Sequence, residues 1–359
     1  MKTTRKSNFE LLRCVLMLMV VVVHYNNVSM GKAFSYVEPK TANYYLLYWI
    51  ESMAIIGTNG FILLTGYFSH KTTKVSLRKP VGLLGYVAAY NTLFYLMDIL
   101  LQKEAFSWKI FVFTILPKNW YISLFVVLLI LSPYINLCLH RLDKKRYLSL
   151  LTALFVFISG WPTILNIASS RLGISTIGMN TVSFSGDDGG YSLVNFVFLY
   201  LIGAGISKYD LGNHKKRWDI IGYLVCTAFI FIQQLSVGAG WNYSNPLVIL
   251  SGICMFQIFR KVEIQSNMIN LFSKASLGVF LIHTHALIHD DFWSLFDIRR
   301  ACMESGIRLG MNLLLCCLCT YIVCSLIDMG VRFIGKPISL GMDKIPFLRK
   351  TFFEVRNEN

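Results

Sequence analysis

The stretch Arg13-Cys-Val-Leu-Met-Leu-Met-Val-Val-Val-Val-His24 places ten uncharged, apolar residues between a cation and a titratable base. A run of this kind predicts a helix embedded in a membrane. At about 100° per residue, eleven steps bring His24 back to within roughly 20° of Arg13, about 16 Å further along the helix axis. The two side chains are therefore expected to face the same way at different depths.

The composition of the whole chain is that of a polytopic membrane protein. Of its 359 residues, 55% are hydrophobic and 15% are charged, whereas about 25% are charged in soluble domains. The net charge of +15 does not indicate nucleic-acid binding, because the Lys and Arg residues form short clusters between apolar runs. The nine cysteines lie largely in apolar segments, where small buried hydrophobic residues are expected rather than metal ligands or disulfides.

The apolar segments predict an all-α transmembrane helical bundle with about ten spans. At about 20 residues per span, they fall near 14–30, 45–68, 81–101, 119–139, 147–163, 191–207, 219–236, 246–259, 275–289 and 307–333. The positive-inside rule predicts that both termini are cytoplasmic. Of the 34 Lys and Arg residues, 25 lie in segments 1–13, 69–80, 140–147, 207–218, 260–274 and 331–359. We expect one transmembrane domain over residues 1–335 and a cytoplasmic tail over 336–359.

Ionisable side chains within spans cost a few kcal/mol each on insertion scales, so each one suggests a function. Arg13 alone has the alternative of a snorkelling residue at the membrane edge. With His24 on the same face, it favours an elongated anionic ligand, its phosphates at the guanidinium and its reactive end at the imidazole. Glu51 and His24 each lie about six residues from the outer ends of their predicted spans, roughly 9 Å deep. Glu51 is expected to orient His24 and stabilise its protonated form, or else to face an aqueous cavity and pair elsewhere; Asp328 is a further acid within a span.

Two other polar segments invite a site hypothesis. In Leu281–Asp291, His285 and His289 have a zinc-like spacing, but His283 points roughly 160° away from His285, so no metal is expected. His283 lies deeper in its span and is the better candidate for a buried hydrogen-bonding role. The segment Gly186–Gly190, with two aspartates, is predicted to be a flexible solvated turn; binding of a polar acceptor or a cation is the alternative.

Four stretches, in order, resemble the acyltransferase 3 family, integral-membrane bacterial enzymes that O-acylate sugars of surface and secreted glycans. Asn8–Arg13, followed by ten residues and His24, resembles the start of that family. Asn59–Phe68 resembles its phenylalanine-rich Ser-Gly segment, with Thr65 in place of the serine. The other two are Asn119–Pro133, similar to its Trp-Tyr segment ending in Ser-Pro, and Ser276–His283, similar to its late Gly-Ile-Tyr-Leu-Ile-His segment.

The resemblance implies a multi-pass O-acyltransferase of the bacterial cell membrane. Its donor would be cytoplasmic acyl-CoA, usually acetyl-CoA, and its acceptor a sugar hydroxyl of a cell-surface polysaccharide or of a lipid-linked oligosaccharide precursor. Arg13 and His24 would occupy the family's essential Arg and His positions. The Lys/Arg clusters at 71–79 and 141–146 are expected mainly to orient the protein, with CoA-phosphate binding as a second role. The alternative function is a transporter or flippase of a lipid-linked glycan, which broken helices and inverted repeats would favour; the sequence shows neither.

Two mechanisms remain open for the predicted catalytic residues. His24 acts either as general base on the sugar hydroxyl or as an acyl acceptor that relays the group outward. Asn59 and Trp120 are candidate oxyanion donors, with helix-interface hydrogen bonding and membrane anchoring as their alternatives. Thr65 and Tyr121 are further candidates for contacts with substrate.

Overall fold

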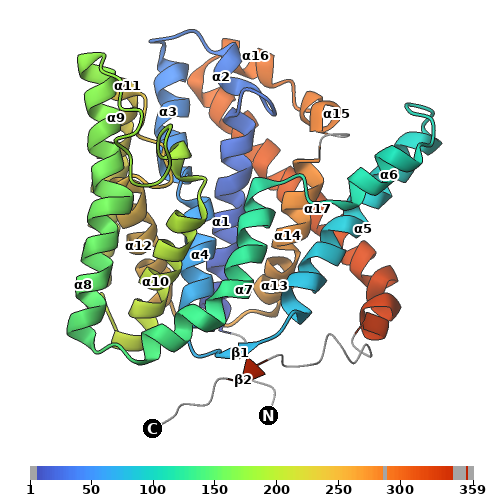
Figure 1. The fold of residues 1–359 in the computed structure, drawn as a ribbon. Helices are drawn as coiled ribbons and strands as arrows, with labels where there is room; N and C mark the ends of the chain where they lie inside the picture. Colours follow the sequence, from blue (N-terminus) through green and yellow to red (C-terminus); the bar gives the residue numbers. More distant parts are fainter. Residues whose placement is uncertain (1–5, 286–288, 343–352, 355–359) are drawn as a thin grey trace.

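The computed structural model describes residues 6–285, 289–342 and 353–354 of the chain, and it is 75% helical. The predicted all-α fold is confirmed, because the helices form one bundle (Figure 1). The strands in these described ranges are β1 (Lys74–Val75) and β2 (Phe353–Glu354), which pair antiparallel. The bundle therefore depends on helix packing alone.

Seven helical segments of the described chain are long and apolar enough to cross a membrane. They are α1 (Ser7–Asn26), α3 (Ala42–Ala54) with α4 (Gly57–Ser69), α5 (Arg78–Leu100), α7 (Trp120–His140), α8 (Lys144–Leu154) with η1 (Phe155–Gly160) and α9 (Trp161–Leu172), α11 (Lys216–Val237), and α17 (Gly306–Met342). Two shorter apolar helices are α10 (Leu193–Tyr209) and α12 (Pro246–Arg260). The remaining predicted span, 275–289, contains α14 (Ser276–His283), and its residues 286–288 lie outside the described ones.

Short elements connect these helices. They are α2 (Ala33–Tyr36), α6 (Trp108–Ile115), η2 (Asp188–Gly190), α13 (Asn267–Phe272), η3 (Ser273–Ala275), α15 (His289–Ser294) and α16 (Ile298–Met303). Helices thus coincide with all ten predicted apolar segments, while the number of membrane crossings and the cytoplasmic location of the termini stay predictions.

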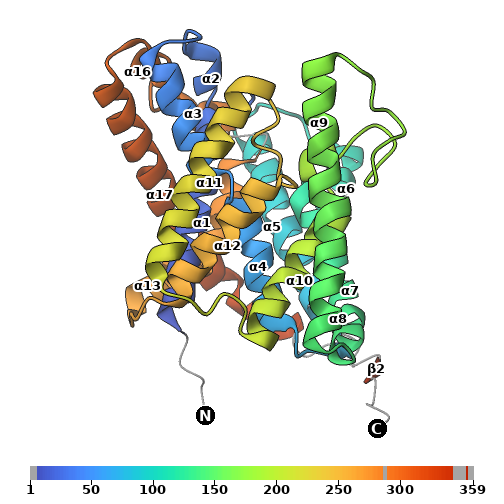
Figure 2. The same ribbon diagram turned by 90° about the vertical axis from the view of Figure 1, so that its left-hand side faces the viewer.

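The predicted C-terminal tail begins inside a helix. α17 continues past residue 335 to Met342, and its end lies with the start of α1 in the lower part of both views (Figure 2). At the same end, β2 pairs with β1, with Lys74 opposite Glu354. The rest of the tail, 343–352 and 355–359, lies outside the described residues, so its predicted cytoplasmic position stays a prediction.

α1 is the central helix, with α8 and α9 on one flank of the bundle and α17 on the opposite flank (Figures 1 and 2). A helix that is apolar on several faces is stable only when neighbours cover those faces. One stripe of α1 packs into a core with α4, α10 and α12, and a second stripe packs into a core with α5, α14 and α17. The first stripe consists of Phe9, Leu12 and Leu16, and the second of Met17, Val21 and Tyr25.

The crossing of α4 and α10 depends on two glycines. A Cβ atom added at Gly66 would overlap the carbonyl oxygen of Tyr200, and one added at Gly203 would overlap the carbonyl oxygen of Leu63. Small residues let helix backbones approach this closely, as they do in many membrane bundles. The crossing fixes α4, and with it the neighbouring Thr65, relative to the rest of the bundle.

The variant Gly66→Ala is therefore expected to destabilise the protein by about 1–3 kcal/mol, because two backbones must move apart. The midpoint of thermal unfolding of the purified protein measures this loss. Gly82→Ala on α5 is the matched control, since its Cβ would meet no atom within 4 Å. Equal midpoints for the two variants would contradict the proposed contact.

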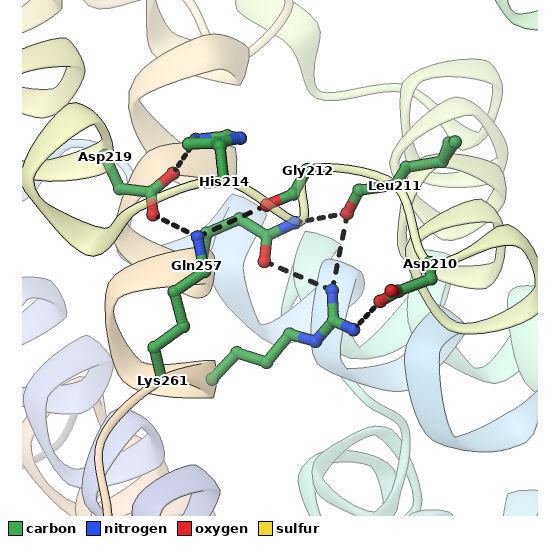
Figure 3. A network of polar contacts seen from close by, with 8 residues as sticks. Asp210, Leu211, Gly212, His214, Asp219, Gln257 and Lys261 are labelled. Atoms are coloured by element: carbon green, nitrogen blue, oxygen red, sulfur yellow. Dashed lines mark hydrogen bonds and ion pairs between the residues drawn. The ribbon is translucent and has the colours of Figure 1, made fainter.

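A polar network ties the loop after α10 to the last turn of α12 (Figure 3). The buried carboxylate of Asp219 accepts a hydrogen bond from Lys261 Nζ at 2.6 Å and lies 2.6 Å from His214 Nε2. Arg260 forms an ion pair with Asp210 at the end of α10, and this guanidinium lowers the pKa of Asp210. The network fixes α12 against α10 and α11 at a place outside the cavity described below.

Candidate active site

A cavity of about 720 Å³ runs along α1. On α1 its wall consists of residues three or four positions apart, a spacing that forms one face of a helix. Segments of α4, α7 and α14 line the other sides. The residues on α1 include Arg13, Met17, Val20 and His24, and Asn27 follows directly after the helix. The predicted common face of Arg13 and His24 is therefore present, and both side chains line the same cavity.

The Arg13 end of the cavity is cationic, because Lys79 and Lys274 line it together with Arg13. Arg13 Nη1 donates to Glu10 Oε1 at 2.6 Å, and the other oxygen of that buried carboxylate accepts from Ser273 Oγ at 2.5 Å. Glu10 thus links α1 to η3 and holds the guanidinium in place. Sequence reasoning missed Glu10, although its spacing of three residues from Arg13 on one helix is the signal that could have found it.

At the other end, His24 forms a hydrogen bond to His283 of α14. His24 Nδ1 lies 2.8 Å from His283 Nε2, and His283 Nδ1 lies 2.5 Å from the carbonyl oxygen of Val279. Because a carbonyl oxygen only accepts, neutral His283 carries its proton on Nδ1 and accepts on Nε2. His24 therefore donates from Nδ1 and has its lone pair on Nε2. His283 is fully buried, as its predicted hydrogen-bonding role requires, whereas His24 lines the cavity.

The expected pairing of Glu51 with His24 is wrong. The buried carboxylate of Glu51 accepts from Asn26 Nδ2 at 2.8 Å. Asn26 and His24 are two residues apart on α1, so their side chains point about 200° apart around the helix axis. The two residues share a level along α1, but the Glu51 carboxylate bonds Asn26 and interacts electrostatically with Tyr191 and Tyr243 rather than with His24. Glu51 does not line the cavity, and a role for it in the chemistry stays a prediction.

Three of the remaining predicted residues do line the cavity, namely Thr65, Trp120 and Tyr121. Thr65 Oγ1 donates to the carbonyl oxygen of Phe61 at 2.8 Å and retains its lone pairs. Trp120 and Tyr121 open α7, which begins there because Asn119 Oδ1 accepts from the backbone N–H of Tyr121 at 3.0 Å. α7 thereby starts on the cavity wall.

Asn59 does not line the cavity, so the structure does not place it as an oxyanion donor. Its fully buried amide donates to the carbonyl oxygen of Tyr243 at 2.9 Å. The alternative of hydrogen bonding at a helix interface describes this contact better, since it joins α4 to the loop before α12. Tyr243 itself lines the cavity, and sequence reasoning missed it.

The predicted solvated turn at Gly186–Gly190 is wrong for Asp187, which is 5% exposed. Its carboxylate accepts from Ser244 Oγ at 2.7 Å and from the amides of Asn166 and Asn242, each at 3.3 Å. These side-chain donors satisfy the hydrogen-bonding capacity of the buried carboxylate oxygens. The segment therefore joins the long loop after α9 to the loop before α12.

Asp328 of α17 likewise lies away from the cavity. Its carboxylate accepts from the hydroxyls of Tyr86 and Tyr90 on α5, and Arg332 Nε lies 2.7 Å from it. A Cβ added at Gly278 would overlap the Asp328 side chain. Only glycine at position 278 therefore lets α14 pack this closely against α17. This explains one residue of the late motif by packing.

Comparison with known proteins identifies a family. A sequence profile of the acyltransferase 3 family, described as an acyltransferase domain, matches residues 6–332 and includes every residue that lines the cavity. No curated protein and no solved structure matches the chain. Since the profile covers nearly the whole chain and the matched region consists of long apolar helices, the chain belongs to the acyltransferase 3 family and is a membrane acyltransferase.

Proposed function

We propose that the protein is an O-acetyltransferase that moves an acetyl group from acetyl-CoA at the Arg13 end of the cavity to a sugar hydroxyl at the His24 end. The observation that carries this proposal is the continuity of the cavity between the two residues. They are eleven positions apart on one helix, about 16 Å, so one ligand with an extended arm reaches from one to the other. The phosphates of CoA bind Arg13, Lys79 and Lys274, and the pantetheine arm lies along α1.

In this mechanism, His24 Nε2 takes the proton of the sugar hydroxyl as its oxygen attacks the thioester carbon. The carbon–sulfur bond then breaks, and the CoA thiolate takes the proton back from His24. Throughout, His283 Nε2 accepts a hydrogen bond from the Nδ1–H of His24 and stabilises the imidazolium that forms, as the carboxylate does in a catalytic triad. The hydrogen bond between the two rings supports this assignment.

The alternative is a relay, in which the same lone pair of His24 attacks the thioester and an acyl-imidazole forms before the sugar arrives. Incubation with labelled acetyl-CoA and no acceptor distinguishes the two mechanisms. Labelled His24 in a peptide digest favours the relay, and unlabelled protein with active transfer favours the general base.

The family resemblance supports a cell-surface polysaccharide, or its lipid-linked precursor, as the acceptor, and the bacterial cell membrane as the location. Cytoplasmic acyl-CoA is consistent with the predicted orientation, which puts the Arg13 end of α1 in the cytoplasm. The test is transfer of labelled acetyl from acetyl-CoA to glycan by purified protein in nanodiscs. Movement of a lipid-linked glycan across vesicles without any thioester cleavage would instead favour the flippase.

The variant Arg13→Gln is expected to raise KM for acetyl-CoA about tenfold, because it removes one charge-assisted hydrogen bond to phosphate, and to leave kcat nearly unchanged. Steady-state release of the free thiol measures both constants. S-acetylpantetheine, which lacks the phosphates, is the matched donor and should show no change in KM. An equal loss with both donors, or a similar loss in the exposed variant Arg141→Gln outside the cavity, would contradict phosphate binding by Arg13.

A further inference from the structure

Three aromatic rings wall the His24 end of the cavity: Trp120, Tyr191 and Tyr243. The ring centroids of Trp120 and Tyr191 are 4.4 Å apart, and those of Tyr191 and Tyr243 are 5.1 Å apart, each pair edge to face. Trp120 and Tyr191 keep 36% and 47% of their surface exposed, so neither is consumed by core packing. Exposed rings of this kind bind the C–H faces of a pyranose while their polar atoms bond its hydroxyls.

Lys118, an exposed lysine two residues before Trp120, also lines the cavity. Over the residues that the structure describes, its Nζ has no hydrogen bond or ion pair, and no Asp or Glu lines the cavity. The phosphates of the acyl donor, acetyl-CoA, account for Lys79 and Lys274 at the Arg13 end. They do not account for Lys118, because that residue lies beyond His24, where the acceptor binds.

The aromatic wall is held in place by buried polar groups. The backbone N–H of Tyr243 donates to the carbonyl oxygen of Gly189 at 2.7 Å, and its own carbonyl accepts from the buried amide of Asn59. Asp187, two residues before Gly189, accepts a hydrogen bond from Ser244, the residue that follows Tyr243. A Cβ added at Gly190 would overlap the backbone of Ser244, so the two loops pack as closely as backbone allows. The wall is therefore a preformed surface, which lowers the entropic cost of binding.

We infer that the His24 end of the cavity is a subsite for an anionic sugar, stacked on Trp120 and Tyr191, whose carboxylate or phosphate pairs with Lys118. The inference rests on the proposed function, because it names the chemical class of that function's acceptor. Asn59 and Asp187 act on the sugar only through Tyr243 and are positioning residues. The acceptor is a glycan whose acylated unit, or the unit next to it, carries an acid.

Binding to purified protein in phosphatidylcholine nanodiscs tests this directly, without any need for turnover. Three methyl β-D-glycosides serve as probes and differ only at C6: methyl β-D-glucuronide, methyl β-D-glucopyranoside 6-phosphate and methyl β-D-glucopyranoside. We expect at least one acidic probe to bind about tenfold more tightly than the neutral one, and the tighter of the two identifies the acid. NMR titration gives the dissociation constants.

Lys118→Gln should remove that preference and leave the affinity for the neutral glucoside unchanged. Lys109→Gln, at an exposed lysine of α6 outside the cavity, is the matched control and should bind like the wild type. Tyr191→Leu should weaken all three probes equally, because it removes stacking rather than charge. Equal affinities in the wild type, or a preference that survives Lys118→Gln, would overturn the subsite.

Two further measurements distinguish the sugar subsite from a lipid site and from the acyl-transfer activity. If anionic phosphatidylglycerol in the nanodiscs abolishes the preference, Lys118 binds lipid headgroups and the sugar subsite is overturned. Acyl transfer is measured separately on the same samples. An acidic preference without transfer supports the subsite and contradicts the proposed function, whereas transfer without any charge preference does the reverse.

Discussion

The variant His24→Ala is expected to lower kcat for acyl transfer by a factor of about 10² to 10⁴, the contribution of a positioned general base. A sugar hydroxyl is a weak nucleophile at neutral pH, so attack on the thioester requires a base within hydrogen-bond reach. His24 lines the cavity, and its Nδ1 is occupied by His283, which leaves Nε2 for the substrate. Thiol release from acetyl-CoA by the protein in nanodiscs, with acceptor present, measures the loss.

The control variants must distinguish loss of the general base from loss of the folded structure. His24→Gln keeps a polar side chain of similar length but supplies no base, so it should fold like the wild type and lose nearly as much activity as the alanine variant. His140→Ala, at an exposed histidine at the end of α7 outside the cavity, should retain full activity. Normal turnover by a folded His24→Ala protein would exclude both the general base and the acyl relay.

The geometry within α1 was predictable from sequence, because one helix has one rotation per residue. That is why the shared face of Arg13 and His24 is present as predicted. The hydrogen-bond partner of His24, His283, lies on a second helix, α14. The rotation of α14 about its own axis depends on contacts between helices, which the hydrophobic pattern of the sequence does not contain. The close approach of Gly66 to Tyr200 and of Gly278 to Asp328 fixes α4 and α14. Such packing placed His283 against His24.

Glu51 shows the same limit from the other side. The lengths of the hydrophobic runs predict that Glu51 and His24 lie at similar depths. The hydrogen bond to Glu51 from Asn26, which is two residues after His24 on α1, agrees with that prediction. Depth leaves the angle around the helix axis undetermined. An acid at the level of His24 can therefore bond a neighbouring amide instead, as Glu51 does with Asn26.

The polar loops were the least predictable part of the candidate site. Asp187 follows a glycine and precedes Asp188-Gly189-Gly190, a composition typical of a solvated turn. Its burial depends on Ser244 and Asn166, which are 57 and 21 residues away. Such long-range partners bury a segment whose sequence is typical of a solvated turn. The local sequence does not indicate which residues these partners are.

The second large effect is expected at His283, which we place as a positioning residue for His24. His283→Phe should fill a similar volume while removing the acceptor of the Nδ1 proton. Neutral His24 is then free to carry its proton on either nitrogen, and its imidazolium loses a hydrogen bond. Loss of the corresponding group in a catalytic triad costs about 10⁴ in kcat. Since neutral His283 supplies less charge stabilisation than a carboxylate, we expect a loss of about 10² to 10³.

His283→Gln is the conservative variant that distinguishes positioning from packing. The glutamine carbonyl can accept a hydrogen bond from the Nδ1–H of His24, so kcat should recover to within about tenfold of the wild type. KM for acetyl-CoA should stay near the wild-type value in both variants, because the phosphates bind at the far end of the cavity. A purely structural His283 would instead give two variants that lose stability and activity in parallel, with no rescue by glutamine. Such parallel loss would leave His24 as a base whose tautomer is set by some other contact.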